Sequence, residues 1–152
     1  MERPIEYDNL VTKGSFKDAV RDPASIKQFM ASAEDFAASI KPELPPTPRF
    51  TLAYEGMFLV VMAVMEHYGT RPGEGSGHRS TAIGRVAGDL KLDSAMLSTL
   101  LRSHDNRNRI TYKSSIPPVT KSQADAMVKI FDTMLTRAKT LLAAEEKREP
   151  DA

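Results

Sequence analysis

The sequence contains no cysteine and no tryptophan among its 152 residues. The absence of cysteine excludes disulfide scaffolds, thiolate zinc sites and cysteine nucleophiles. There are only three histidines, and no pair of them has the His-Glu-x-x-His spacing of zinc proteases. We therefore expect no metal site and no cofactor. A chain without cysteine also fits a reducing compartment, so we predict a cytoplasmic protein.

A large net charge and a long apolar segment are also missing. The 21 basic and 20 acidic residues leave a net charge of +1, so binding to nucleic acid would have to come from local clustering of cations. Residues 1–10 lack the apolar core of a signal peptide. The most apolar run covers only residues 57–65, which is too short to span a bilayer, so we expect a buried central helix and no membrane partner.

Helical spacing of apolar residues predicts an all-α domain. We expect a bundle of four main helices with a short fifth, because no segment keeps the period-two alternation of a strand. The predicted organisation is an N-terminal arm with one or two short turns at residues 1–22, a single helical domain at 23–146 and a flexible tail at 147–152.

Capping residues and prolines set the expected helix ends. Asp22-Pro23 and Asp93 each open a helix, and Thr120 with Gln123 forms a capping box before a helix that reaches about residue 146. Thr47-Pro48 is expected to open the apolar helix, over residues 48–68. The short helix is expected at residues 80–90, after a glycine-rich segment that lacks the Gly-Lys-Ser/Thr ending of a P-loop and is predicted to be a connector.

The segment at residues 107–113, RNRITYK, carries the main functional signal. At ~100° per residue, His104, Arg107 and Asn108 fall on the helix face of Leu97, so the apolar stripe continues as polar residues. Four cations stand close together against a single acid, Asp105, and would suit phosphate: Arg102, Arg107, Arg109 and Lys113.

A purely structural account of the same residues stays open. Cations near a helix C-terminus interact favourably with the helix dipole, and the last turn of the helix can simply extend beyond the core into water. This alternative predicts that Arg107 pairs inside its own subunit, with Asp105 or Glu55.

The order of these features resembles the HEPN domains of bacteria and archaea. It includes the segment AYEGMFLVVMAVMEHYGTRP, the loop GEGSGHRS, RNRITY and a final amphipathic helix, and it covers roughly residues 9–143. The resemblance implies a helical bundle that forms a homodimer, and often a metal-independent endoribonuclease of a toxin–antitoxin or defence system. It also implies a nucleotidyltransferase antitoxin as a partner.

The family signature is Arg-Asn, three variable residues and then His. Arg107-Asn108 matches its start, so the resemblance implies that Arg107 binds phosphate and that Asn108 orients the motif. Tyr112 stands in the place of the histidine, and a phenol with a pKa of ~10 is a poor base at neutral pH. Tyr112 could still contact a phosphate or stack on a base.

Two histidines are candidates to replace the missing one. His104 lies one turn before Arg107 on the same face, although a surface histidine near a helix end is the simpler expectation. His78 follows Arg71 at the family's spacing, but its loop context differs and we treat the match as chance. In some HEPN toxins the partner adds nucleotides to a tyrosine near the motif. This chain has Ser114 at that place, so Tyr112 would be the tyrosine considered for such a modification.

Two functional hypotheses follow. In the first, paired Arg107 and Asn108 of a homodimer form a basic RNA-binding cleft, and a metal-independent nuclease would use His104 or Tyr112 for proton transfer or contacts. In the second, the protein is a catalytically inactive HEPN module that binds a nucleotidyltransferase or another partner protein. The missing histidine favours the second hypothesis, and the retained Arg-Asn pair favours the first.

Overall fold

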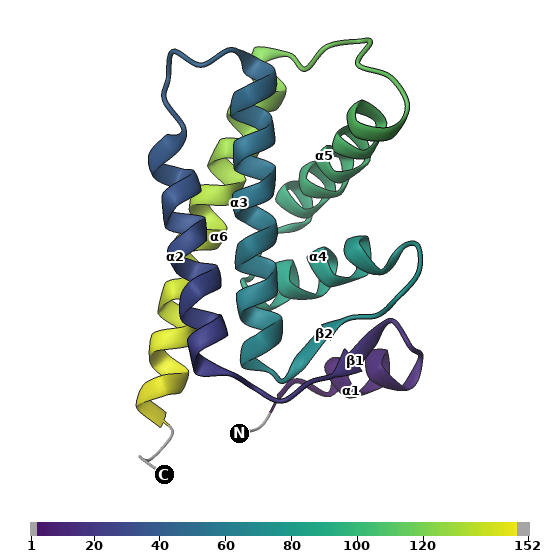
Figure 1. Ribbon diagram of the computed structural model, residues 1–152, viewed down its shortest axis with the longest axis vertical. Helices are drawn as coiled ribbons and strands as arrows, with labels where there is room; N and C mark the ends of the chain where they lie inside the picture. Colours follow the sequence, from purple (N-terminus) through teal and green to yellow (C-terminus); the bar gives the residue numbers. More distant parts are fainter. Residues whose placement is uncertain (1–2, 149–152) are drawn as a thin grey trace.

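The computed structural model describes residues 3–148, and in that range the chain forms six helices and one small antiparallel sheet (Figure 1). The expected all-α class is thus confirmed in its main part. The elements in order are α1 (Ile5–Thr12), β1 (Phe16–Asp18), α2 (Pro23–Ser39), α3 (Pro46–His67), β2 (Thr70–Pro72), α4 (His78–Asp89), α5 (Ser94–Tyr112) and α6 (Lys121–Arg148).

Helix α3 is the centre of the molecule. In Figure 1, α2 and α6 lie along one side of α3, and α4 and α5 lie on the other. By length and composition α3 could cross a bilayer, but 61% of its most apolar window is buried inside the protein, as expected for a core helix. The other helices thus remove the apolar surface of α3 from water, and this burial is the main favourable term in folding.

Three predicted helix starts are confirmed by their capping bonds. The Asp22 carboxylate accepts from the Ala24 amide at 3.0 Å, and the Asp93 carboxylate accepts from the Met96 amide at 2.8 Å. Thr120 and Gln123 exchange two bonds, of 3.1 and 3.0 Å, as a capping box does. Helix α3 instead begins at Pro46, two residues before the predicted start, because a proline at the first position needs no hydrogen-bond donor.

The N-terminal segment is more structured than an arm with one or two short turns. Residues 5–12 form α1, and β1 pairs with β2, with Phe16 opposite Pro72 and Asp18 opposite Thr70. Tyr7 and Phe16 are fully buried in the core. The expectation of no strand was wrong, because three-residue strands are too short to show alternation and their pairing joins distant parts of the chain. Helix α6 reaches Arg148, and residues 149–152 of the predicted tail lie outside the described residues.

A close contact between α3 and α6 is possible because residue 56 is glycine. A Cβ built on Gly56 would overlap the ring of Phe131, with its Cε2 atom at 2.7 Å. Gly84, in α4, has nothing within 4 Å of the same constructed atom. Both glycines lie inside helices, so the two positions differ mainly in the space around them.

Gly56→Ala is therefore expected to destabilise the protein by about 1–3 kcal/mol through overpacking against Phe131, despite the better helix propensity of alanine. Gly84→Ala is the matched control and should stabilise by about 0.5–1 kcal/mol, because it gains propensity without a clash. Urea unfolding of the two variants measures both signs. Equal effects would show that the contact between Gly56 and Phe131 does not limit packing.

Candidate functional site

A connected group of polar side chains lies where α3 meets α4 and α5. We call it the polar cluster; its members are Tyr54 and Glu55 from α3, Arg79 from α4, and His104, Arg107 and Asn108 from α5. Tyr54 and Glu55 are two polar residues within an otherwise apolar stretch of α3. The polar continuation of the stripe on α5 therefore faces the rest of the protein, as predicted. His104 contacts Tyr54 of α3, and Arg107 contacts Glu55 of α3.

His104 is the most enclosed titratable group of the cluster. Its side chain is buried, with only 7% exposed, so the expectation of a surface histidine was wrong. The Nδ1 atom lies 2.8 Å from the Tyr54 hydroxyl, and Nε2 lies 3.2 Å from the amide nitrogen of Asn108. Because the amide nitrogen can only donate, Nε2 accepts and the ring proton is assigned to Nδ1, which donates to Tyr54. His104 is thus held in place by two bonds.

Burial also sets the protonation of this site. It lowers the pKa of His104 below its ordinary value of 6.5, and the charges of Arg79 and Arg107 lower it further, against the opposing effect of Asp105. Burial likewise raises the pKa of Tyr54. Both groups are therefore neutral at pH 7, and neither is prepared to act as a strong base.

Arg107 is paired inside its own subunit. Its Nη2 atom donates to the Glu55 carboxylate at 3.1 Å, and Nη1 donates to the side-chain oxygen of Asn108 at 3.3 Å. Its guanidinium also lies near two aromatic rings, 5.1 Å from the centre of Tyr54 and 5.9 Å from that of Tyr112. The pairing with Glu55 is the arrangement that the structural account of this segment predicts. Only 18% of the Arg107 side chain is exposed, against 35% for Glu55.

The other predicted cations do not join the cluster. Arg109 donates to the Ser114 carbonyl at 2.8 Å and to the Pro117 carbonyl at 2.9 Å, so it fixes the segment after α5. Arg102 is exposed and contacts Thr99, and Lys113 is exposed at the end of α5. The local charge seen in the sequence is therefore spread around the helix instead of gathered on one face.

Tyr112, which occupies the position of the family histidine, is 74% exposed. Within the described residues, its one contact with the cluster is that of its ring with the Arg107 guanidinium. An exposed phenol at this place can contact a ligand, and among the described residues it makes no hydrogen bond to His104, whose partners are Tyr54 and Asn108.

Arg79 is a member of the cluster that the sequence did not reveal. It lies in the first turn of α4, which begins at His78, two residues before the predicted start, so the end of the predicted glycine-rich connector is helical. Its guanidinium is 4.0 Å above the ring centre of Phe58, and its Nη1 atom is 3.5 Å from the Tyr54 hydroxyl. One feature of the sequence could have indicated this part of the cluster. The polar pair Tyr54-Glu55 lies inside the apolar helix, about one turn before Phe58. Such a pair indicates that α3 needs polar neighbours at this point.

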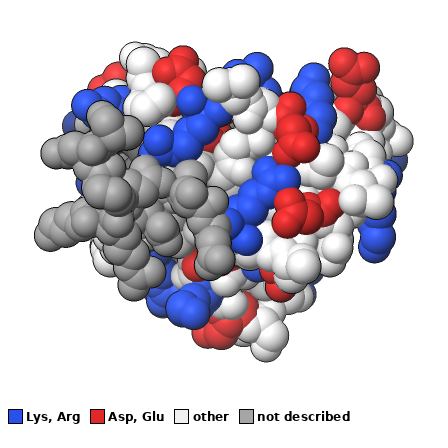
Figure 2. Space-filling model, turned by 90° about the horizontal axis from the view of Figure 1, so that it is seen from below, with Lys and Arg blue, Asp and Glu red and all other residues white. Residues whose placement is uncertain are grey.

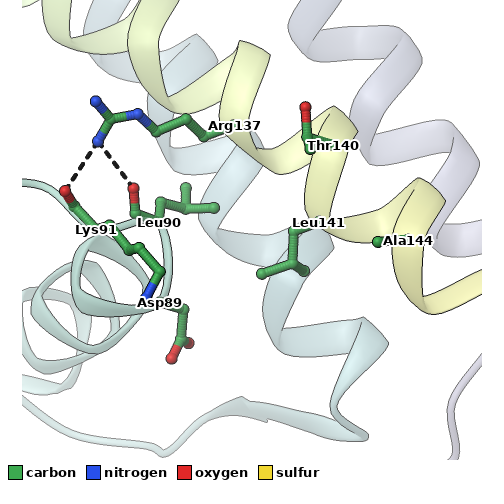
Figure 3. A pocket seen from close by; sticks show the side chains of 7 residues that line it. All are labelled: Asp89, Leu90, Lys91, Arg137, Thr140, Leu141 and Ala144. Atoms are coloured by element: carbon green, nitrogen blue, oxygen red, sulfur yellow. Dashed lines mark hydrogen bonds between the residues drawn. The ribbon is translucent and has the colours of Figure 1, made fainter.

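Other regions of the molecule offer weaker sites. An open hollow of about 870 Å³ lies between the end of α4 and α6, but Arg137 there already donates to the carbonyls of Leu90 and Lys91 (Figure 3). At the end of the molecule seen in Figure 2, basic and acidic side chains alternate over the visible surface. Among the side chains that the structure describes, those of residues 3–144, no group of three metal-ligating residues comes together.

Comparison of the chain with protein-family models, with curated proteins and with solved structures finds no match.

The environment of His104 gives a pH prediction. Because the folded-state pKa is lowered, the neutral imidazole is favoured in the folded protein, and its contribution to stability is complete above about pH 6.5. That contribution is lost as the pH falls through the folded-state pKa. The wild type should therefore lose more stability between pH 6.5 and pH 5 than His104→Gln, which cannot titrate there.

Urea midpoints across this range measure that difference, and the imidazole signals in an NMR titration give the pKa of His104 directly. A pKa of 6.5 or higher would contradict the buried, neutral assignment.

Proposed function

We propose that this protein is a HEPN-like helical bundle that acts as a homodimer and binds RNA at the polar cluster. The observation that carries the proposal is that the Arg107-Asn108 pair is part of a defined network with His104 and Tyr54. Asn108 bonds to both Arg107 and His104, so it orients the two groups as the family resemblance implies. Exposed Tyr112 beside Arg107 adds a ring on which a base can stack.

Binding is better supported than cleavage. General acid–base catalysis needs a group that reaches the reacting hydroxyl and titrates near neutral pH. Both nitrogens of the His104 imidazole are already bonded, and burial lowers its pKa. Tyr112 is accessible but is a poor base. If the protein does cleave RNA, Arg107 would stabilise the phosphate and the reaction would be independent of metal ions.

A second function is favoured by one specific observation. Arg107 is neutralised by Glu55 in the same subunit, which is what a structural role for this arginine predicts. In that case the protein is a non-catalytic interaction module, and the end of α5 contacts a nucleotidyltransferase antitoxin or another partner protein. The two functions differ in whether RNA binding depends on the cluster.

The deciding experiment measures binding and cleavage of a labelled, structured RNA by the purified protein in EDTA. Arg107→Ala removes a cation and leaves the Glu55 carboxylate unpaired, so binding should weaken by about tenfold. Lys27→Ala on α2 is the matched control for the loss of one charge, because Lys27 is exposed and lies outside the cluster. His104→Ala tests whether this residue is needed for any cleavage.

Equal binding by the wild type, Arg107→Ala and Lys27→Ala would exclude Arg107 from the RNA site and favour the interaction module. Cleavage by the wild type that persists in EDTA and disappears in Arg107→Ala would establish a metal-independent nuclease.

The proposed dimer rests on exposed apolar side chains near the end of α5. Ile116 is 77% exposed and Tyr112 is 74% exposed, and both lie within nine residues of the Arg107-Asn108 pair whose two copies the proposed dimer brings together. Ile116→Glu should weaken self-association by about tenfold or more, because a buried carboxylate without a partner is costly. Ile5→Glu is the control, since Ile5 is 68% exposed but belongs to α1. Sedimentation measurements over a range of protein concentrations compare the two, and a monomeric wild type would exclude the dimer.

A further inference from the structure

The cation of the polar cluster with no acidic partner is Arg79 and not Arg107. Glu55 accepts from Arg107, whereas Arg79 makes no ion pair within the described part of the chain. The second carboxylate near the cluster, that of Asp105, is exposed and pairs with neither arginine. With His104 neutral, the positive charge that a ligand would meet here is therefore that of Arg79.

The surroundings of Arg79 hold its guanidinium in place without neutralising it. The ring of Phe58 lies below it at 4.0 Å, and the Tyr54 hydroxyl accepts one bond at 3.5 Å. Tyr54 and Phe58 are one turn apart on α3, so both contacts come from one rigid helix. Stacking on a ring uses the face of the guanidinium and leaves the N–H groups along its edge free to donate.

Arg79 is half-buried, and its remaining N–H groups are not enclosed by the protein. An arginine side chain carries five N–H donors, and only one contact of Arg79, to Tyr54, uses any of them. No nitrogen of Arg79 is both buried and without a partner, unlike the Nε atoms of Arg49 and Arg85. A planar fork that is already oriented and still accessible is well suited to phosphate, since little side-chain freedom is lost on binding.

We propose that Arg79 is the residue that binds the RNA phosphate, and that Arg107, paired with Glu55, positions Asn108 and His104 without binding phosphate itself. This proposal rests on the proposed RNA-binding function and assigns the contact to a different helix from the Arg-Asn motif. Its consequence is that removing Glu55 and Arg107 together, at no change in net charge, should cost no phosphate contact, whereas removing Arg79 should cost one.

The test compares three variants with the wild type in binding a fluorescently labelled single-stranded RNA of mixed sequence. Arg79→Gln should weaken binding by about tenfold and reduce the slope of log affinity against log salt by about 0.7, the value for one phosphate contact on a single strand. The double variant Glu55→Gln/Arg107→Gln should lose less affinity than Arg79→Gln and keep the salt slope of the wild type, because it removes the positioning pair and no phosphate contact. Lys27→Ala should change the affinity by less than Arg79→Gln. Thermal unfolding of each variant checks that the fold is retained.

The outcomes separate the two proposals. Loss of binding in Glu55→Gln/Arg107→Gln with unchanged binding in Arg79→Gln would overturn this assignment and leave RNA binding through Arg107. Absence of binding by the wild type would overturn the RNA function, and the assignment with it. NMR gives a second readout that needs no RNA: on titration with inorganic phosphate, the Nε–H signal of Arg79 should move more than that of Arg107. Equal or reversed shifts would contradict the proposal.

Discussion

The structure depends on the burial of α3. This helix is apolar around most of its circumference, so a single partner helix could not remove it from water, and it requires neighbours on several sides. Helices α2 and α6 pack along one side and α4 and α5 cover the other. Gly56 lets α6 approach at one point, because the Phe131 ring occupies the space of a side chain there. The rest of the fold can be understood as the means of surrounding this helix.

The same constraint creates the candidate site. Where α3 carries Tyr54 and Glu55, a polar surface would be buried beneath α4 and α5 at a cost unless partners were supplied. His104 bonds to Tyr54, and Arg107 bonds to Glu55. The cluster therefore has a structural explanation that is complete for every member except Arg79, whose charge is left uncompensated. Arg79 belongs to no recognised motif, but its uncompensated charge is the reason that we propose it as the residue that binds phosphate.

Much of the fold could be predicted from local signals. The caps at Asp22, Asp93 and Thr120 are short-range interactions, and each was visible as a residue type at a fixed spacing. The small sheet was not visible, since pairing of Phe16 with Pro72 joins segments far apart in the chain. The burial of Tyr7 depends on contacts of the same long range, including its hydroxyl bond of 2.6 Å to Asp89.

Only part of the site could be predicted, because local spacing is visible in the sequence and contacts between distant segments are not. Helical spacing correctly placed His104, Arg107 and Asn108 on one face of α5, because that is a property of one helix. It could not reveal that Glu55 neutralises Arg107 or that Arg109 is used to fix the next segment, since these bonds depend on how helices and loops meet. A count of cations along the sequence thus overstates the charge available to a ligand. What a ligand meets is the charge that remains after intramolecular pairing. In this cluster that charge belongs to Arg79 in the first turn of α4, because Arg107 of the α5 motif is paired with Glu55.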